Sequence, residues 1–150
     1  MVDRDYNEVV DVFVHDRVTD TTTLISASLM GSSANDASFP PSMSYDGRFV
    51  AFGSFATNMV FNDNNSVSSV FVRSRYTNEI VLVDVNDDGV QADGGTADTA
   101  TGMTGTGDHI GFVSIADNLV SNDLNELLDV FVAPNPILAS LAAAGEEVLC

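Results

Sequence analysis

The stretch DNNSVSSVFV at residues 63–72 decides the fold, because the same pattern occurs three times. Its other copies are DYNEVVDVFV at residues 5–14 and DLNELLDVFV at residues 123–132. All three follow Asp-x-Asn-x-x-x-(Asp or Ser)-Val-Phe-Val, and successive copies begin 58 and 60 residues apart. A period in this range is typical of repeat folds, in which each unit buries its hydrophobic face against the next unit. The sequence therefore predicts stacked units.

The composition suits one folded domain of unusual charge. The chain has 150 residues, of which 45% are hydrophobic, and this is enough to form a core. It carries 22 acidic residues against five arginines, and its formal net charge is −17. This balance disfavours nucleic acid and anionic membranes as partners and favours cations. It also suits a protein that stays soluble in salty or extracellular surroundings, and composition does not separate the two interpretations.

No disulfide or targeting signal is recognisable in the sequence. Cys150 is the only cysteine, so an intramolecular disulfide cannot form. Residues 1–5 lack the basic start and apolar run of a signal peptide. No segment approaches the roughly 20 apolar residues of a membrane helix, so we expect no membrane insertion.

Each copy of the motif ends in a strand, and in the first two units a turn and a second strand follow. These segments are rich in β-branched and aromatic side chains. Asp20 and Asn78 occupy equivalent turn positions, where a positive φ is expected and where Asp and Asn are tolerated better than most residues. The strands expected here are residues 10–17, 22–26, 70–75 and 80–85.

A second hairpin precedes the motif. Residues 38–44 lead into YDGR at residues 45–48, where Asp-Gly favours a tight turn. Residues 49–52, FVAF, follow as an apolar run without alternation, and in the third unit residues 109–112 lie at the same place after Gly107. A strand that is apolar on both faces must be covered on both faces. We therefore expect sheets stacked on sheets.

One period thus contains four short strands, and radially repeated four-stranded antiparallel sheets are the building blocks of a β-propeller. The fold class predicted is all-β. Phenylalanines that recur at equivalent positions are expected in the core between blades, and these are Phe13, Phe52, Phe71, Phe112 and Phe131.

Two segments resemble the TolB-like (WD-like) β-propeller repeat family of bacterial proteins. Residues 41–52, PSMSYDGRFVAF, are similar to its Ser-x-Asp-Gly-(Lys or Arg)-x-(Ile or Val)-Ala-Phe signature. Residues 11–19, DVFVHDRVT, are similar to its Asp-(Val or Ile)-(Phe or Tyr)-Val-x-Asp-x-x-Thr strand and turn. The resemblance covers roughly residues 3–133 and implies an extracytoplasmic setting, periplasmic or secreted. It implies a platform architecture and leaves the function open, because one fold hosts many functions.

The repeats predict an incomplete propeller of about two and a half blades. Propellers typically contain about 4–8 blades, and the three units here provide two, four and three strands, nine in all. The expected organisation is a partial propeller at residues 1–133, followed by an irregular or helical C-terminal tail at residues 134–150. The tail is either loosely docked or a helix that covers an edge or binds a partner. The expected blade fragments are residues 1–30, 31–89 and 90–133.

The loop part of the repeated motif is the best candidate for a metal site. Each copy places two or three oxygen-bearing side chains within seven residues, and Ca²⁺ prefers such ligands. The alternative is that Asp and Asn bond neighbouring backbone groups and hold the turn. Ser69 replaces an acid and weakens the second copy. The candidate ligands are Asp5, Asn7, Asp11, Asp63, Asn65, Asp123, Asn125 and Asp129.

A second acidic loop, DVNDDG at residues 84–89, matches part of an EF-hand calcium loop. The position that should hold the last Glu ligand is Gly95, and no flanking helices are expected, so the match is partial. Asp93 and Asp98 are further acids that could complete an irregular site. The alternative is a polar, glycine-rich connection between blades.

The sequence contains few signals for catalysis. The sequence contains neither Gly-x-Ser-x-Gly nor His-Glu-x-x-His, and the lack of lysine excludes a P-loop. His15 and His109 lie at different repeat positions and are expected to be strand or surface histidines.

We therefore expect a non-catalytic β-propeller segment that acts as a protein-interaction or structural module. Its partners would be another protein or the remaining blades of a parent protein, and uncovered sheet edges would promote self-association. Two alternatives stay open. One is a calcium-binding module built on the acidic loops, and the other is the accessory propeller part of a larger hydrolase or lyase.

Overall fold

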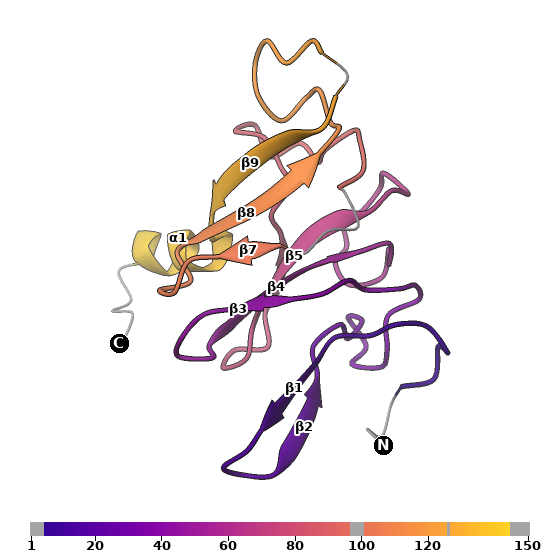
Figure 1. Ribbon diagram of the computed structural model, residues 1–150, viewed down its shortest axis with the longest axis vertical. Helices are drawn as coiled ribbons and strands as arrows, with labels where there is room; N and C mark the ends of the chain where they lie inside the picture. The colour runs from indigo at the N-terminus through magenta and orange to yellow at the C-terminus, as the bar shows by residue number, and fades with distance from the viewer. Residues whose placement is uncertain (1–4, 97–100, 126, 145–150) are drawn as a thin grey trace.

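The computed structural model describes residues 5–96, 101–125 and 127–144, which form an all-β arrangement with one short helix (Figure 1). The strands are antiparallel to their neighbours throughout. The elements are β1 (Phe13–Asp16), β2 (Thr21–Leu24), β3 (Ser42–Met43), β4 (Phe49–Ser54), β5 (Ser69–Ser74), β6 (Ile80–Leu82), β7 (Gly102–Met103), β8 (His109–Ser114), β9 (Asp129–Pro134) and α1 (Pro136–Ala143).

The strands form three sheets in chain order. The first sheet is β1-β2, the second is β3-β4-β5-β6 and the third is β7-β8-β9. The expected distribution of two, four and three strands is confirmed. Several strands are shorter than expected, and β1 begins at Phe13 because the carbonyls of Val10 and Val12 already bond the N–H groups of Ser38 and Ile25 outside the ladder.

The second sheet is covered on both faces. All six residues of β4 and all six of β5 are buried. Because side chains alternate along a strand, Phe52 and Phe71 join a core shared with the first sheet. Val70 and Val72 point to the opposite face and join a core shared with the third sheet. The prediction of sheets stacked on sheets is confirmed for β4 and β5.

Four of the five recurring phenylalanines form cross-strand pairs. Phe52 lies opposite Phe71 with ring centroids 6.0 Å apart, and Phe112 lies opposite Phe131 with centroids 5.6 Å apart. The expectation for Phe13 is wrong, since 36% of its surface is exposed. Its side chain projects from the face of β1 that points away from the second sheet, and no sheet in the described part of the chain covers that face.

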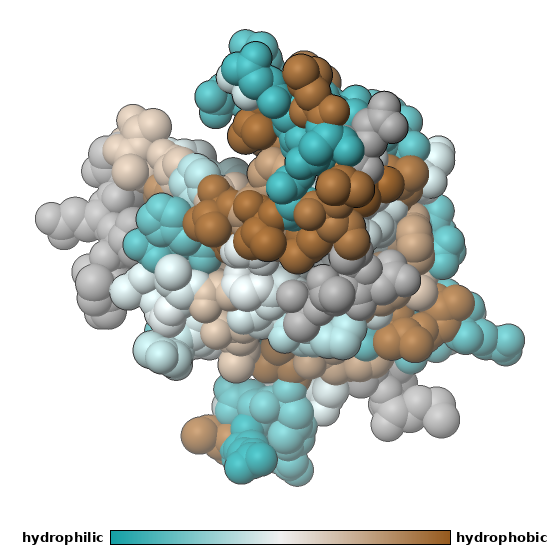
Figure 2. All heavy atoms as spheres, turned by 45° about the horizontal axis from the view of Figure 1, so that its top comes forward, coloured by the Kyte–Doolittle hydropathy of each residue, from teal (hydrophilic) through white to brown (hydrophobic). Residues whose placement is uncertain are grey.

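The outer face of the third sheet is likewise left uncovered by the residues that the structure describes. Val130 is 77% exposed and Val132 is 68% exposed, whereas the inward-facing Phe131 packs against the core between the second and third sheets. Figure 2, turned so that the β9 side comes forward, shows hydrophobic residues gathered on this side of the molecule. The stack therefore ends in an apolar surface.

The turn predictions hold at the backbone. Asp20 has φ 54° and Asn78 has φ 63°, as expected for the equivalent turns after β1 and β5. Gly47 has φ 69°, and its N–H donates to the Ser44 carbonyl in the loop between β3 and β4. Asp46 accepts bonds from the Ser44 hydroxyl and the Arg48 N–H, so its side chain braces the same loop.

The described part of the C-terminal tail is a docked helix. Asn135 caps α1 by accepting a hydrogen bond from the Ile137 N–H, and its Nδ2 donates to the Gly107 carbonyl. Ile137 is 1% exposed and belongs to the core between the second and third sheets, where Leu138 and Leu141 also pack. Residues 145–150 lie outside the described residues.

Phe71→Ala and Phe13→Ala provide a matched test of whether the second sheet is covered on both faces and the first sheet on only one. We expect Phe71→Ala to lower the free energy of unfolding by about 3–5 kcal/mol, because it opens a cavity in a core where the side chain is fully buried. Phe13→Ala, at the equivalent repeat position, should cost about 1 kcal/mol or less. Urea titration followed by circular dichroism measures both. Equal losses would contradict the assignment of Phe13 to an uncovered face.

Candidate functional site in the loops between the sheets

The asparagine of the repeated motif braces its own loop. Asn65 Oδ1 accepts a hydrogen bond from the Val67 N–H at 3.1 Å, and its Nδ2 donates to the Ala92 carbonyl at 3.0 Å. Both ends of the amide are therefore bonded to the backbone. Asn7 makes the equivalent bonds, with the Val9 N–H at 3.2 Å and the Ala34 carbonyl at 2.8 Å.

This brace holds a backbone conformation that is unfavourable for most side chains. The residue after each of these asparagines has a positive φ, 58° at Glu8 and 56° at Ser66. In the third copy Asn125 Oδ1 accepts from the Leu127 N–H at 2.8 Å, and its Nδ2 donates to Asp129 at 3.0 Å. The asparagines thus stabilise the turns through hydrogen bonds to the backbone, which is the alternative to metal binding that the sequence left open.

The aspartates of the motif have different environments in the three copies. Asp5 is exposed, Asp123 is half-buried, and Asp63 is buried with 9% of its surface exposed. Asp63 Oδ1 accepts a hydrogen bond of 2.8 Å from Gln91 Nε2, which also donates to Ser69 Oγ at 3.0 Å. The second copy therefore contains a buried polar cluster.

The central group of this cluster is Asp84, which lies two residues beyond β6. Its surface is 0% exposed, and neither carboxylate oxygen has a hydrogen-bond partner. Burial raises the pKa of Asp84 to about 7, and the negative charge of Asp63 acts in the same direction. The Ser69 hydroxyl and the Val70 N–H lie near enough to lower this pKa in part. The cluster comprises Asp63, Ser69, Asp84 and Gln91.

The first sheet contains the same pair of groups with their positions exchanged. Asp11 precedes β1 and accepts a hydrogen bond from the hydroxyl of Ser26, which follows β2. The equivalent residues in the second sheet are Ser69 and Asp84, so the carboxylate and the hydroxyl have changed strands. One oxygen of Asp11 is buried without a partner, and burial raises its pKa. Asp5 lies close enough to raise it further.

Sequence reasoning missed this pair. It treated Ser69 as a weakened ligand and Asp84 as the first residue of an EF-hand-like loop. The available signal was the joint change of Asp11 to Ser69 and of Ser26 to Asp84 when the first two units are aligned. In the first sheet the two groups are joined by a hydrogen bond from Ser26 to Asp11, whereas the oxygens of Asp84 accept none.

The described acids of the loop after β6 do not converge on a common metal site. Asn86 Oδ1 accepts from the N–H groups of Asp88 and Val90, so Asn86 braces the turn. Asp84 is buried while Asp87 and Asp88 are exposed. Asp93 bonds the Asp117 N–H, and Asp98 lies outside the described residues. Among the residues that the structure describes, no group of three or more His, Cys, Asp or Glu side chains could hold a metal ion.

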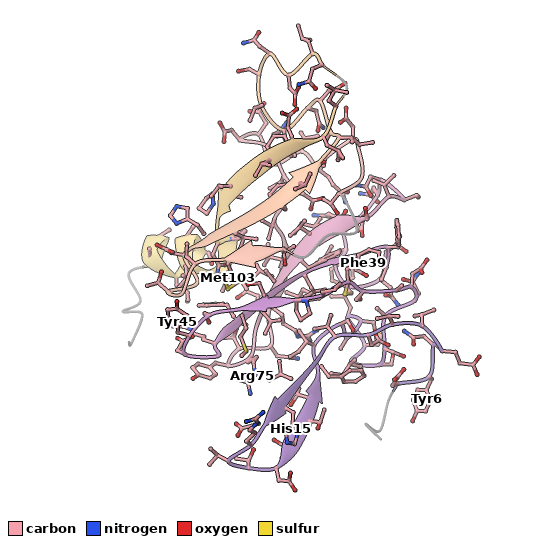
Figure 3. The ribbon with its side chains drawn as sticks, viewed as in Figure 1. Tyr6, His15, Phe39, Tyr45, Arg75 and Met103 are labelled. Carbon is pink, nitrogen blue, oxygen red and sulfur yellow. The ribbon has the colours of Figure 1, made fainter. Side chains whose placement is uncertain are left out.

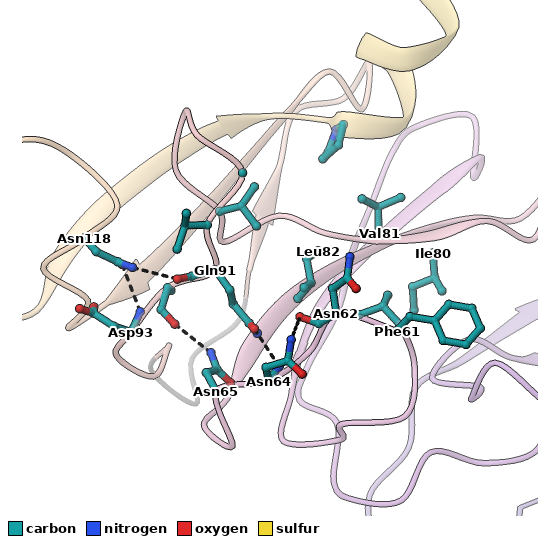
Figure 4. Close-up of a pocket in the computed structure, with 16 residues that line it drawn as sticks. Phe61, Asn62, Asn64, Asn65, Ile80, Val81, Leu82, Gln91, Asp93 and Asn118 are labelled. Carbon is teal, nitrogen blue, oxygen red and sulfur yellow. Dashed lines mark hydrogen bonds between the residues drawn. The ribbon is translucent and has the colours of Figure 1, made fainter.

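An open pocket of about 850 Å³ adjoins the buried cluster (Figure 4). Residues of the loops before β5 and after β6 line it, together with β6 itself. Its walls combine apolar side chains with amides, and Asn64 N–H donates to Gln91 Oε1 across it. The polar lining residues are Asn62, Asn64, Asn65, Gln91, Asp93 and Asn118.

The histidines lie on strands and are about half exposed, as expected. His15 on β1 contacts the Thr22 hydroxyl at 3.0 Å, and Figure 3 places it on the β1-β2 hairpin away from the other sheets. His109 begins β8 and lies 3.4 Å from the Asp108 carboxylate.

The comparisons with known proteins add no relative. No protein-family model matches the chain, and neither the search of curated proteins nor that of solved structures returned a match. Within the described residues, none of the helices has the length and apolar character needed to cross a membrane.

Asn65→Ala tests whether the motif asparagine acts as a brace. We expect it to lower the free energy of unfolding by about 1–3 kcal/mol, because the Ala92 carbonyl loses its donor. Asn125→Ala, at the exposed equivalent site, should change it by only about 0.5 kcal/mol. Both are measured by urea titration, in parallel in CaCl₂ and in EGTA. A loss at Asn65 that disappears in EGTA would show that this residue stabilises the loop only through a bound cation.

Proposed function

We propose that the chain is a non-catalytic β-propeller segment that serves as a structural and protein-interaction module, and that it works by stacking onto a further sheet of the same kind. The observation that carries this proposal is the uncovered apolar face of the third sheet. A face of this kind on a soluble protein marks an interaction site.

The equivalent face of the second sheet indicates what kind of surface would cover the exposed face of the third sheet. Val130 and Val132 of β9 correspond to Val70 and Val72 of β5 in the repeat. Val70 and Val72 are 0% exposed because the third sheet packs over them, whereas Val130 and Val132 are largely exposed. The third sheet thus presents the surface that the second sheet uses to bind its successor.

The first sheet presents the complementary surface. Phe71 faces the first sheet and is fully buried, whereas Phe13, at the equivalent position, has no sheet against it in the described part of the chain. The two ends of the stack therefore carry the two halves of one interface. A head-to-tail contact between such halves is heterologous and can continue from molecule to molecule.

The strand edges fit the same arrangement. In the second sheet β5 pairs with β4 on one side and β6 on the other. Its equivalent β1 pairs only with β2, and its equivalent β9 pairs only with β8, in the residues that the structure describes. Unpaired strand edges are templates for association with another chain. The resemblance to the TolB-like family supports the same module, with further blades or a partner protein supplying the missing sheet.

Two complementary variants test this proposal, with a second copy of the chain as the partner. Val130→Asp with Val132→Asp disables the third-sheet face, and Phe13→Asp disables the first-sheet face. We expect the wild type to associate with increasing concentration and each variant alone to be monomeric, because a buried unpaired charge opposes the contact. An equimolar mixture of the two variants should form a dimer, since each retains one intact half.

Sedimentation velocity in EGTA measures these states, and circular dichroism checks that each variant is folded. Met30→Asp is the control, because Met30 is 92% exposed and belongs to the connection between β2 and β3. A wild type that remains monomeric at its highest soluble concentration and melts cooperatively would contradict the proposal. A mixture in which both variants stay monomeric would contradict the head-to-tail geometry.

A further inference from the structure

We propose that the carboxylates of Asp63 and Asp84 form a binding site for a divalent cation, Ca²⁺, at the base of the loop that precedes β5. This site differs from the loop ligands expected from the motif, because it joins the loop before β5 to the residues after β6. It stands independently of the proposed stacking function.

The first argument is the state of the Asp84 side chain. It is fully buried, and both of its oxygens lack a hydrogen-bond partner. Buried polar groups in native proteins nearly always have a partner, and a carboxylate without one requires an explanation such as an ion. A cation is a partner that can satisfy both oxygens at once.

The second argument is the neighbouring charge. Asp63 is also buried and lies close enough to Asp84 for their negative charges to repel. Within the described residues, neither carboxylate forms an ion pair with an arginine or a histidine. Repulsion between two buried carboxylates is relieved either by a proton on one of them or by a bound cation, and a low-dielectric interior strengthens it. The chain's overall charge of −17 favours an external cation as its source.

The third argument is the way in which neighbouring groups hold this pair. Gln91 Nε2 bonds both Asp63 Oδ1 and Ser69 Oγ, at 2.8 and 3.0 Å. Ser69 Oγ also accepts a hydrogen bond from Asn65 Nδ2 at 3.3 Å. These bonds hold Asp63 and Ser69 in place, and none of the groups that make them carries a positive charge.

The fourth argument is that the same combination of two aspartates and a serine occurs in the first unit. The first sheet also combines a loop aspartate, Asp5, with a sheet aspartate, Asp11, and a serine, Ser26. The sheet aspartate and the serine have exchanged strands between the two units, yet the loop aspartate faces a carboxylate in both. A pair of acids thus recurs at equivalent places although the residues that supply it differ.

The chemistry favours calcium over magnesium. Both ions bind carboxylate oxygen, but Mg²⁺ gives up its water reluctantly and demands near-ideal octahedral geometry. Asp84 is fully buried, so the ion must shed part of its water to reach it. Ca²⁺ accepts irregular coordination by carboxylates, carbonyls and water, which suits a site formed where a loop meets a strand end.

Calcium titration of the full chain tests the site. In wild-type protein we expect CaCl₂ to raise the melting temperature relative to EGTA, by about 5–10 °C at a free concentration roughly 100-fold above Kd. MgCl₂ should give a smaller rise. Isothermal titration calorimetry counts the ions bound. Asp84→Asn and Asp63→Asn should each bind one calcium ion fewer than the wild type, and their calcium-dependent rise in melting temperature should shrink accordingly.

Asp88→Asn is the matched control, because Asp88 belongs to the neighbouring acidic loop but is exposed. It should bind as many calcium ions as the wild type. The Asn variants are nearly isosteric, and their melting in EGTA shows that they fold. A wild type whose melting temperature is the same in CaCl₂ and EGTA would overturn the proposal, as would Asp84→Asn binding as many ions as the wild type. An equal response to MgCl₂ would overturn the assignment to calcium.

Discussion

Burial of both faces of β4 and β5 is the constraint on which the rest of the structure depends. A strand with apolar side chains in every position cannot lie at a protein surface without a large loss of hydrophobic stabilisation. The second sheet therefore requires the first sheet against Phe52 and Phe71, and it requires the third sheet against Val70 and Val72. The helix α1 completes the second of these cores through Ile137. Each neighbouring sheet is in turn left with one face that this contact does not use.

Hydrogen bonds within the loops add a second, polar set of stabilising contacts. Asn7 and Asn65 each tie the loop in front of a strand to a backbone carbonyl 27 residues further along the chain, at Ala34 and Ala92. Such bonds to buried or half-buried groups are costly to leave unmade. The loops consequently have defined shapes, and Gln91 holds the buried Asp63 in the second of them. Turn formation and the candidate ion site are thus two parts of one polar layer around the sheets.

Prediction from sequence succeeded where the signal was local or periodic. The positive φ of Asp20 and Asn78, the hairpin at Gly47 and the distribution of strands all follow from turn chemistry and the repeat. It failed at Phe13, because an exposed and a buried copy of one repeat position have the same residue type. It also placed Asp84 in a loop that was either a partial EF-hand match or a polar connection between blades, because a run of acids gives no sign of which carboxylate turns into the core.

The sequence by itself determined the all-β class and the places of the turns, because strand periodicity and turn propensity act over a few residues. Only the tertiary structure decided which copy of each repeat is covered and which is exposed. It also decided which acids meet, since Asp63 and Asp84 are brought together by the pairing of β5 with β6. Burial and charge repulsion depend on neighbours that are distant in the chain, and a pattern of residue types does not contain that information.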